Sequence, residues 1–335
     1  MGAPPPNDAT HRSANSTTDL RTRGPGSPEA APTGAGPTVT RISDYHHLRP
    51  SDRVPPGRPN VFFDPVDTEV GVWATVDLIR PGARVLDLGS GSGAPAAAVA
   101  RAGAGHVHGF DISDDSVAWG IEHHATEDPR GRVSFSGADY SALSPAQLLD
   151  ASPFSTAPDV ITSNPPYVPL PSPDGVGRRS IDGGADGLHL VRRVVGHAEA
   201  LGSDLAVTIG SYTSPRQAAN LLYDHGYQLS ALTLGVLRLG DHTVANIARV
   251  SALEATGEGP LLRIDDGAPY YIVVGLSCRR RDSTPDAAPP PEELLTLLQT
   301  ACRSRTPLLE TLDGFPTRVP LRMVNLPDEH QRLHV

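Results

Sequence analysis

The sequence predicts an α/β fold in which a parallel, doubly wound sheet carries helices on both faces. Two observations support this fold class. Short apolar runs alternate with segments of helical periodicity between residues 61 and 227, and a glycine-rich turn at 87–93 (DLGSGSG) follows the first predicted strand. Strands that alternate with helices at this spacing form βαβ units, whose strands lie parallel in one sheet.

The individual elements are predicted from the spacing of apolar residues and from the turn residues at their ends. We expect helices over 68–79, 94–102, 115–125, 187–200 and 214–225, and parallel strands over 84–88, 106–111, 133–135, 159–163 and 205–209. The alternation stops after Gly226. Two longer apolar runs, 229–239 and 270–277, predict a strand pair, with a helix over 244–253 between them.

Shifts in composition divide the chain into four parts. Residues 1–40 contain few large apolar side chains, so we expect a disordered tail. The other parts are a substrate-side segment with the first helix (41–80), a central domain (81–281) with an insertion or lid (241–269), and a linker with a C-terminal extension (282–335).

Charge and composition narrow the classes of function. The 335 residues carry a formal net charge of −10, which repels polyphosphate and disfavours nucleic acid as a partner. No run approaches the roughly 18 apolar residues of a membrane span, so we expect a soluble, cytoplasmic protein with Cys278 and Cys302 reduced. No cluster has metal-ligand spacing, so the histidines at 46, 47, 106, 108, 123 and 124 are expected to lie on the surface or to cap helices.

The turn at 87–93 predicts a nucleotide-binding site. Its glycines allow a tight turn and a close approach of backbone to ligand, and the next helix presents free N–H groups. Gly89, Gly91 and Ala94 also satisfy the dinucleotide fingerprint G-x-G-x-x-G/A, with Asp111 about 20 residues further on. A nicotinamide-dependent dehydrogenase is therefore an alternative at this point.

Acids at the ends of successive strands favour S-adenosylmethionine instead. Asp87 ends the first strand, where a carboxylate can hold the ammonium group of a methionine moiety. Asp111 would accept from both ribose hydroxyls, and Asp139 would lie beside the adenine amino group. Ligands bind at the carboxyl ends of such strands, so all three acids face one crevice. The predicted cofactor site comprises Asp87, Gly89, Gly91, Gly93, Asp111, Ile112, Asp139, Tyr140 and Asn164.

The fourth strand ends in Ser163-Asn164-Pro165-Pro166-Tyr167-Val168, which predicts a site for a planar –NH2 group. A nitrogen that is methylated must present its electron density along the sulfur–methyl bond. The Asn164 side-chain oxygen and the Pro165 carbonyl are suited to accept its two N–H bonds, and the prolines fix their direction. Tyr167 supplies a ring face for a flat or cationic acceptor.

Residues 61–227 resemble class I methyltransferases that carry an Asn-Pro-Pro-Tyr motif, and among them the release-factor glutamine methyltransferase family. The resemblance also includes Asp64-Pro65-Val66-Asp67-Thr68-Glu69, similar to that family's Pro-Arg-Pro-Glu-Thr-Glu segment, and the DGGADGL sequence at 182–188. It implies a Rossmann-like sheet of seven strands, S-adenosylmethionine as cofactor, and methylation of an amide-like nitrogen.

The chain departs from that family where substrate is chosen. The family's N-terminal helical domain has no counterpart here, its acid before Ile-Gly on the fifth strand is absent from Val207-Thr208-Ile209-Gly210, and the C-terminal end is longer. We therefore expect N-methylation of an amide or guanidine in a small, amino-acid-derived acceptor, in secondary metabolism. The alternatives are a protein glutamine methyltransferase with a peptide acceptor, and an inactive methyltransferase-like scaffold.

Two further expectations concern the acceptor. Helix capping and the helix dipole explain Asp67 and Glu69, which leaves Asp64 to face substrate and help a guanidine, of pKa above roughly 12, to lose a proton. Arg178 and Arg179 are either a clamp for a substrate carboxylate or solvated loop charges. The insertion and the C-terminal segment are expected to cover the acceptor pocket or to form the contact of a homodimer.

Overall fold

The structure is a computed structural model that describes residues 39–58, 61–170, 181–257, 261–265, 267–281, 291–304, 308–313 and 315–326. Residues 1–38 of the predicted tail, residues 282–290 of the predicted linker, and the Arg178-Arg179 pair lie outside these residues. The predictions made for those three segments are therefore not tested by the structure.

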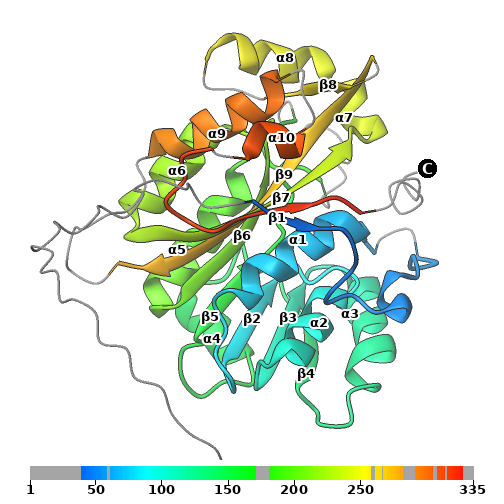
Figure 1. The fold of residues 1–335 in the computed structure, drawn as a ribbon. Helices are drawn as coiled ribbons and strands as arrows, with labels where there is room; N and C mark the ends of the chain where they lie inside the picture. The colour runs from blue at the N-terminus through cyan, green and yellow to red at the C-terminus, as the bar shows by residue number, and fades with distance from the viewer. Residues whose placement is uncertain are drawn as a thin grey trace, which may run out of the picture. The chain divides into compact units, whose positions relative to one another are not determined.

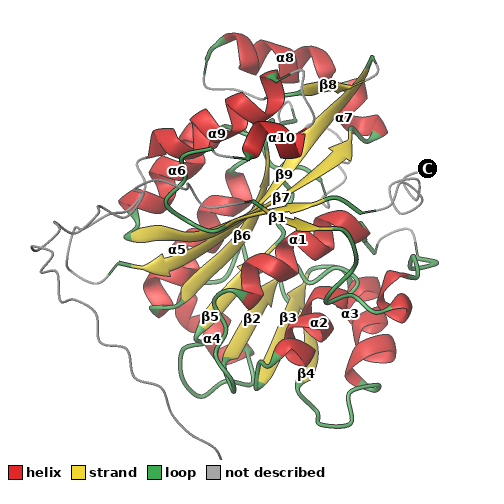
Figure 2. Cartoon of the chain, in the orientation of Figure 1, coloured by secondary structure: helices red, strands yellow, loops and turns green. Residues whose placement is uncertain are grey.

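One mixed sheet runs through the described residues (Figures 1 and 2). The strand order is β1-β10-β7-β9-β6-β5-β2-β3-β4, and β8 pairs with β9 outside this path. Neighbouring strands are parallel, except that β9 is antiparallel to β6, β7 and β8. The strands are β1 (Thr40–Ile42), β2 (Arg84–Leu88), β3 (His106–Asp111), β4 (Val133–Gly137), β5 (Val160–Ser163), β6 (Asp204–Gly210), β7 (Tyr227–Arg238), β8 (Arg263–Asp265), β9 (Ala268–Arg280) and β10 (Leu321–Val324).

The predicted fold class is confirmed, and the sheet is larger than predicted. The path β4-β3-β2-β5-β6-β9-β7 contains the seven expected strands, whereas β1, β8 and β10 are additions. Strand β10 pairs in parallel along the outer edge of β7, and β1 pairs with β10. The additions have only three or four residues, too few for a periodic signal. The predicted tail also extends too far, because Val39 is buried and Thr40 belongs to β1.

Helices cover both faces of the sheet (Figure 2). Apolar residues of α1 and α2 share one buried cluster with β2, β3 and β4, whereas those of α4, α5, α6 and α9 share another on the opposite face. No helix among the described residues is long and apolar enough to cross a membrane. The helices are α1 (Pro65–Val76), α2 (Ala94–Ala102), α3 (Asp114–Gly120), α4 (Pro145–Ala151), α5 (His189–Leu201), α6 (Pro215–Asp224), α7 (Asp241–Ala245), α8 (Ile247–Ala255), α9 (Pro291–Arg303) and α10 (Leu308–Leu312), with a 3-10 turn, η1 (Pro50–Arg53), and a π turn, η2 (Ile121–Ala125).

Local capping explains where the observed helices differ from the predicted ones. Helix α1 begins at Pro65, before the predicted start at 68, because Asp64 accepts a hydrogen bond from the Asp67 N–H and proline suits the first helical position. The single helix predicted over 244–253 is two helices that meet at Asn246. Helix α4 was not predicted, although Ser144 and Gln147 form a capping box at its start.

The segment before α1 is fixed to the domain by buried acids. Asp52 is 6% exposed, accepts a hydrogen bond from the Arg49 N–H, and forms an ion pair with Arg101 of α2. Glu69 of α1 accepts hydrogen bonds from the backbone N–H groups of residues 46, 47 and 48. These contacts determine where the chain enters α1 and therefore where the start of that helix lies.

Candidate functional site

The glycine-rich turn between β2 and α2 has the backbone that only glycine adopts readily. Gly91 has a φ of 52° and Gly93 a φ of 77°. A Cβ atom on Gly93 would lie 2.7 Å from Cζ of Phe135, so a larger residue does not fit there. The Gly91 N–H donates to Oδ2 of Asp111 over 2.8 Å, which joins the turn to the end of β3.

Asp87, at the end of β2, is a buried carboxylate suited to a cationic ligand. It is 3% exposed, and its Oδ2 atom has no hydrogen-bond partner among the described residues. Burial, and secondarily the charge of Asp111, raise the pKa of Asp87 to about 7. An unpaired buried carboxylate costs free energy, which an ammonium group at Oδ2 would offset. The site therefore fits the methionine end of S-adenosylmethionine.

The other predicted cofactor residues surround the same strand ends. Asp111 accepts backbone N–H bonds at both carboxylate oxygens, from Gly91 and Ser113 over 2.8 Å each, and each oxygen retains a second lone pair. Ile112 is 47% exposed, although it is large and apolar. Tyr140 is buried, with its ring edge 3.7 Å from the position of a Cβ on Gly89.

Asp139 has a local structural role in this structure. It is exposed, and its Oδ1 atom accepts hydrogen bonds from the backbone N–H of Ser141 (3.0 Å) and from the Ser141 hydroxyl (2.6 Å). This is the geometry of a turn-capping aspartate. Its predicted role beside an adenine amino group therefore has weaker geometric support than the roles of Asp87 and Asp111.

Strand register brings the reacting motif to the same edge of the sheet. Strand β5 lies beside β2 in parallel, and the Ser163 hydroxyl donates to the Leu88 carbonyl over 2.6 Å. Asn164 follows directly. Its side-chain oxygen accepts a hydrogen bond from the hydroxyl of Thr208 on β6, a residue that is 1% exposed. Thr208 therefore orients the Asn164 amide, and it stands in the position where the resembled family carries an acid.

Residues 182–188 support the backbone of the Asn-Pro-Pro-Tyr turn. Val168 and Asp182 form a β-bridge, and the Gly183 N–H donates to the Val168 carbonyl over 2.9 Å. A Cβ on Gly183 would lie 2.7 Å from Cα of Tyr167, and one on Gly187 would lie 2.5 Å from its carbonyl oxygen. The glycines of this segment are thus required for packing against Tyr167.

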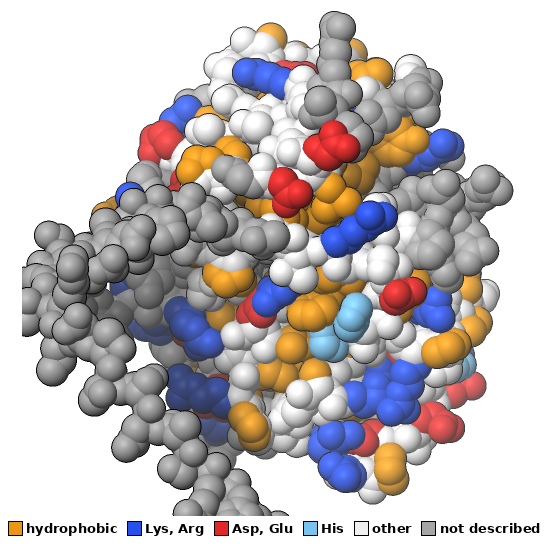
Figure 3. Space-filling model, viewed as in Figure 1, with side chains coloured by type: hydrophobic (Ala, Val, Ile, Leu, Met, Phe, Trp, Pro, Cys, Tyr) orange, Lys and Arg blue, Asp and Glu red, His pale blue; other side chains and the backbone are white. Residues whose placement is uncertain are grey.

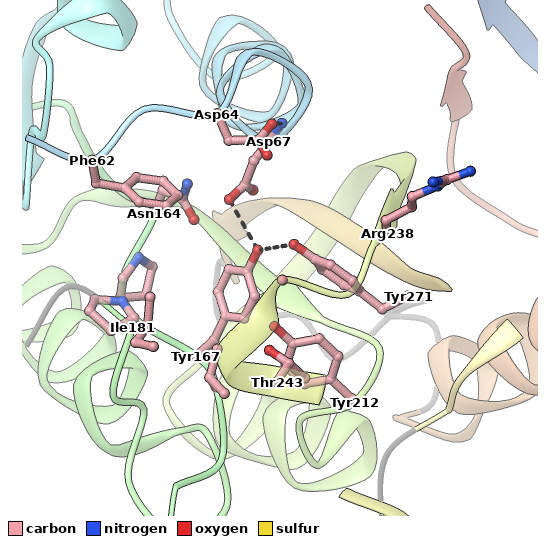
Figure 4. Close-up of a pocket in the computed structure, with 14 residues that line it drawn as sticks. Phe62, Asp64, Asp67, Asn164, Tyr167, Ile181, Tyr212, Arg238, Thr243 and Tyr271 are labelled. Carbon is pink, nitrogen blue, oxygen red and sulfur yellow. Dashed lines mark hydrogen bonds between the residues drawn. The ribbon is translucent and has the colours of Figure 1, made fainter. Parts of the chain in front are cut away.

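Tyr167 lies in a buried network that includes an acid of α1. Its hydroxyl donates to Oδ2 of Asp67 over 3.0 Å and lies 3.2 Å from the Tyr271 hydroxyl (Figure 4). Tyr212 completes a cluster of three rings, with its centroid 4.7 Å from that of Tyr271. Burial raises the pKa of all three phenols well above 10, so they remain neutral. The predicted ring face of Tyr167 is therefore part of a packed cluster whose hydroxyls approach one another.

The roles predicted for the two aspartates are partly exchanged. Asp64, expected to be available for substrate, is the N-cap of α1. Asp67, which capping was expected to explain, directs its Oδ2 atom to Tyr167. Both carboxylates are buried and both line the same pocket, so the prediction failed only in assigning the cap. Either residue satisfies the local sequence preference for an acid at a helix start.

A single pocket collects these groups. It has a free volume of about 150 Å³ and is partly open to solvent. Its lining includes Phe62, Asp64, Asp67, Asn164, Pro165, Tyr167, Tyr212, Arg238, Thr243 and Tyr271 (Figure 4). Phe62 also borders the cofactor turn, because its carbonyl oxygen lies 3.0 Å from the position of a Cβ on Gly91. Thr208, Phe62, Tyr212 and Tyr271 were not predicted, since only the tertiary fold brings them here.

The histidines predicted to be superficial or capping residues are partly buried. His108 is 4% exposed, and it accepts from or donates to the hydroxyls of Ser134 and Ser136 on β4. Burial lowers the pKa of His108 to about 4, so this ring is neutral. His124 is buried near Asp52. No group of three or more metal-ligating side chains occurs among the residues that the structure describes.

One family model and several solved structures are similar to parts of this chain. A family model described as a methyltransferase domain matches residues 85–157. No curated protein matches the chain. Similar solved structures include a ribosomal protein L11 methylase from Lactobacillus delbrueckii subsp. bulgaricus (15% identity, 66% of this chain, 82% of that chain, TM-score 0.38). Another is magnesium protoporphyrin IX methyltransferase from Synechocystis (16% identity, 63% and 77% coverage, TM-score 0.36).

The family match covers the part of the chain predicted to bind the cofactor. It includes Asp87, the three glycines of the turn, and Asp111. Residues 85–157 are therefore similar to a methyltransferase domain, and the predicted cofactor, S-adenosylmethionine, is confirmed. The match removes the dehydrogenase alternative that the fingerprint G-x-G-x-x-G/A left open.

Proposed function

We propose that this protein methylates a nitrogen atom of a small, amino-acid-derived acceptor bound in the pocket beside Asn164. The observation that carries this proposal is the position of Asn164. It directly follows β5, whose end adjoins that of β2 with Asp87, and its side chain lines a pocket that also holds Tyr167 and two acids. The Asp87 side of these strand ends fits the cofactor, and the Asn164 side presents hydrogen-bond acceptors.

Each group has a distinct task in this mechanism. Asp87 and the glycine turn would hold the methionine end of the cofactor, and Asp111 its ribose. When bound, S-adenosylmethionine supplies a methyl group on a positively charged sulfur, which leaves with the electrons of the broken S–C bond. The Asn164 oxygen and the Pro165 carbonyl accept N–H bonds from the acceptor and so direct its lone pair. A carboxylate of the pocket takes the proton that the nitrogen loses.

The pocket favours a small acceptor. Its free volume of about 150 Å³ fits a small acceptor group better than a large one. Thr243 of the 241–269 insertion lines the pocket, which supports the predicted role of that insertion at the acceptor site. In the view of Figure 3, acidic side chains lie among the basic ones over the described part of the face.

The resemblance to release-factor glutamine methyltransferases supports the same reaction, methylation of a nitrogen atom. It gives less support to the same acceptor. Residues 182–188, the most similar segment beyond the motif, pack against the backbone of Tyr167. This support is needed for any acceptor that uses Asn164. A peptide glutamine therefore remains the alternative acceptor, and secondary metabolism remains part of the proposal for the small one.

A methyl-transfer screen tests the proposal. The full chain is incubated with S-adenosylmethionine and with separate sets of amino acids, glutamine-containing peptides and nucleosides, while S-adenosylhomocysteine formation is followed. We expect turnover with an amino-acid-derived set and its loss in Asn164→Ala at unchanged cofactor affinity. Turnover only with nucleosides, or full activity of Asn164→Ala, would refute the proposed role of the pocket.

A further inference from the structure

His197 is a buried histidine that the proposed mechanism does not use. It lies on α5 and is 4% exposed. Its neighbours on the buried face of that helix are apolar, and they share one cluster with Tyr140. The Nε2 atom of His197 lies 2.8 Å from the backbone carbonyl oxygen of Tyr140, 57 residues earlier in the chain. This contact joins α5 to the turn that follows β4.

The contact with Tyr140 determines the tautomer of the His197 ring. A carbonyl oxygen only accepts hydrogen bonds, so Nε2 must carry the proton and donate it. Burial lowers the pKa of His197, which favours the neutral ring, and Nδ1 then keeps a lone pair without a partner among the described residues. One hydrogen bond gained and one buried acceptor left unpaired nearly offset each other in folding free energy. Filling of the core therefore explains a histidine poorly at this place, since an apolar side chain would avoid the unpaired nitrogen.

The turn after β4 is connected to the residues of the cofactor site. The Ala138 N–H donates to the carbonyl of Asp111 over 2.9 Å, which joins the turn to the residue expected to bind the ribose. The Tyr140 ring lies against the glycine-rich turn, with Cε1 3.7 Å from the position of a Cβ on Gly89. Strand β4 lies beside β3 in parallel, so this turn is at the edge of the sheet where ligands bind. The backbone of residues 138–141 is thus placed to contact the adenosine end of the cofactor.

We propose that His197 is a positioning residue for the adenosine end of S-adenosylmethionine, because it fixes the Tyr140 carbonyl and, through it, the turn at 138–141. This inference rests on the cofactor site of the proposed function and adds to it a residue of α5 that acts through Tyr140. Without the bond from His197, the turn keeps its connection to Asp111 but loses its connection to α5. The base of the cofactor then binds to a less rigid surface, whereas the methionine end, at Asp87, is unaffected.

Two amide side chains of different length test the bond. The side-chain nitrogen of glutamine corresponds in position to Nε2 of histidine, whereas that of asparagine corresponds to Nδ1. His197→Gln should therefore keep the bond to Tyr140, and His197→Asn should lose it. In calorimetry with S-adenosylhomocysteine, we expect a dissociation constant within about threefold of the wild-type value for His197→Gln. For His197→Asn it should rise on the order of tenfold, the effect of one lost hydrogen bond.

A ligand with a modified base locates the effect. S-inosylhomocysteine differs from S-adenosylhomocysteine in the base alone, where an oxygen replaces the amino group and N1 carries a proton. We expect the wild-type protein to prefer S-adenosylhomocysteine, and this preference to fall by at least about threefold in His197→Asn. Asp87→Asn, at the methionine end, should weaken both ligands by the same factor. His106→Asn, at the start of β3 and so at the opposite end from the cofactor site, is the matched control and should change neither affinity.

Unchanged affinity for S-adenosylhomocysteine in His197→Asn, or an equal loss in His197→Gln, would overturn the inference. A loss in His197→Asn of the same factor for both ligands would also overturn it, because that result indicates a general loosening of the protein. Melting temperatures show whether each variant is folded, and His197→Phe, a ring without a donor, replaces His197→Asn if the latter is not. These experiments need no acceptor and are therefore independent of the methyl-transfer screen. Failure of the wild-type protein to bind S-adenosylhomocysteine would instead count against the proposed function.

Discussion

Replacing Asp87 with asparagine removes the buried charge that the cofactor is expected to neutralise. In an unfolded chain an aspartate has a pKa near 3.8, whereas burial raises that of Asp87 to about 7. The folded protein without cofactor therefore binds this proton more tightly than the unfolded chain does. Its stability falls as pH rises from about 4 to about 7, by at most about 4 kcal/mol. Asp87→Asn should be the more stable protein above pH 7 and lose this advantage near pH 4.

Cofactor affinity should change in the opposite direction. The variant loses a hydrogen bond to a charged group, which costs about 1.5–3 kcal/mol, or roughly 10- to 150-fold in the dissociation constant of S-adenosylhomocysteine. In the wild-type protein this affinity should fall about tenfold for each pH unit below 7, because the carboxylate must ionise to bind an ammonium group. The variant should lack this dependence.

The assays are urea denaturation of the protein without cofactor and calorimetric titration with S-adenosylhomocysteine, both between pH 5 and pH 8. Asp204→Asn is a poor control, because Asp204 pairs with Arg279; the exposed Asp150 offers the same substitution without a described ion pair. Unchanged affinity in Asp87→Asn, together with unchanged stability above pH 7, would show that Oδ2 does not face the cofactor.

Three further predictions follow from described contacts. Asp111→Ala should weaken S-adenosylhomocysteine binding by about 1.5–3 kcal/mol in calorimetry, and unchanged affinity would mean that the ribose lies elsewhere. Asn164→Ala should keep cofactor affinity and raise the barrier to methyl transfer by about 3–5 kcal/mol. Thr208→Val should raise this barrier less, because it only frees the Asn164 amide to rotate. Equal losses of kcat in the two variants would contradict this order. Asp52→Ala should lower the free energy of unfolding by about 1–3 kcal/mol in urea, because Arg101 loses its buried partner, and no change would show that the segment before α1 is anchored by other contacts.

The sequence was sufficient for the parts of the fold that rest on local signals. Apolar periodicity and glycine positions predicted β2, α2 and β3 at their observed bounds, and with them the cofactor turn. Strand β10 was missed because its four residues form a strand only by pairing with the edge of β7, which is far away in sequence. Short strands of this kind are determined by tertiary pairing and not by propensity.

The residues of the candidate site were likewise predicted only where a local sequence signal marks them. Asn164 and Tyr167 were found because the motif is contiguous. Their partners were not, since Asp67 is 100 residues from Tyr167 and Thr208 is 44 residues from Asn164. The helix cap was assigned to Asp67, whereas Asp64 is the cap, because both residues satisfy the preferences of a helix start and only the packing of Tyr167 against α1 distinguishes them.

Methyl transfer to a nitrogen atom can be tested by locating the transferred carbon in the product. The protein is incubated with S-adenosylmethionine labelled with ¹³C at the methyl group and with the acceptor that the screen identifies. The carbon chemical shift and its long-range proton couplings then identify the atom to which the methyl group is bound. We expect a methyl group on a planar nitrogen, and no such product from Asn164→Ala. A methyl group on oxygen, sulfur or carbon would contradict it.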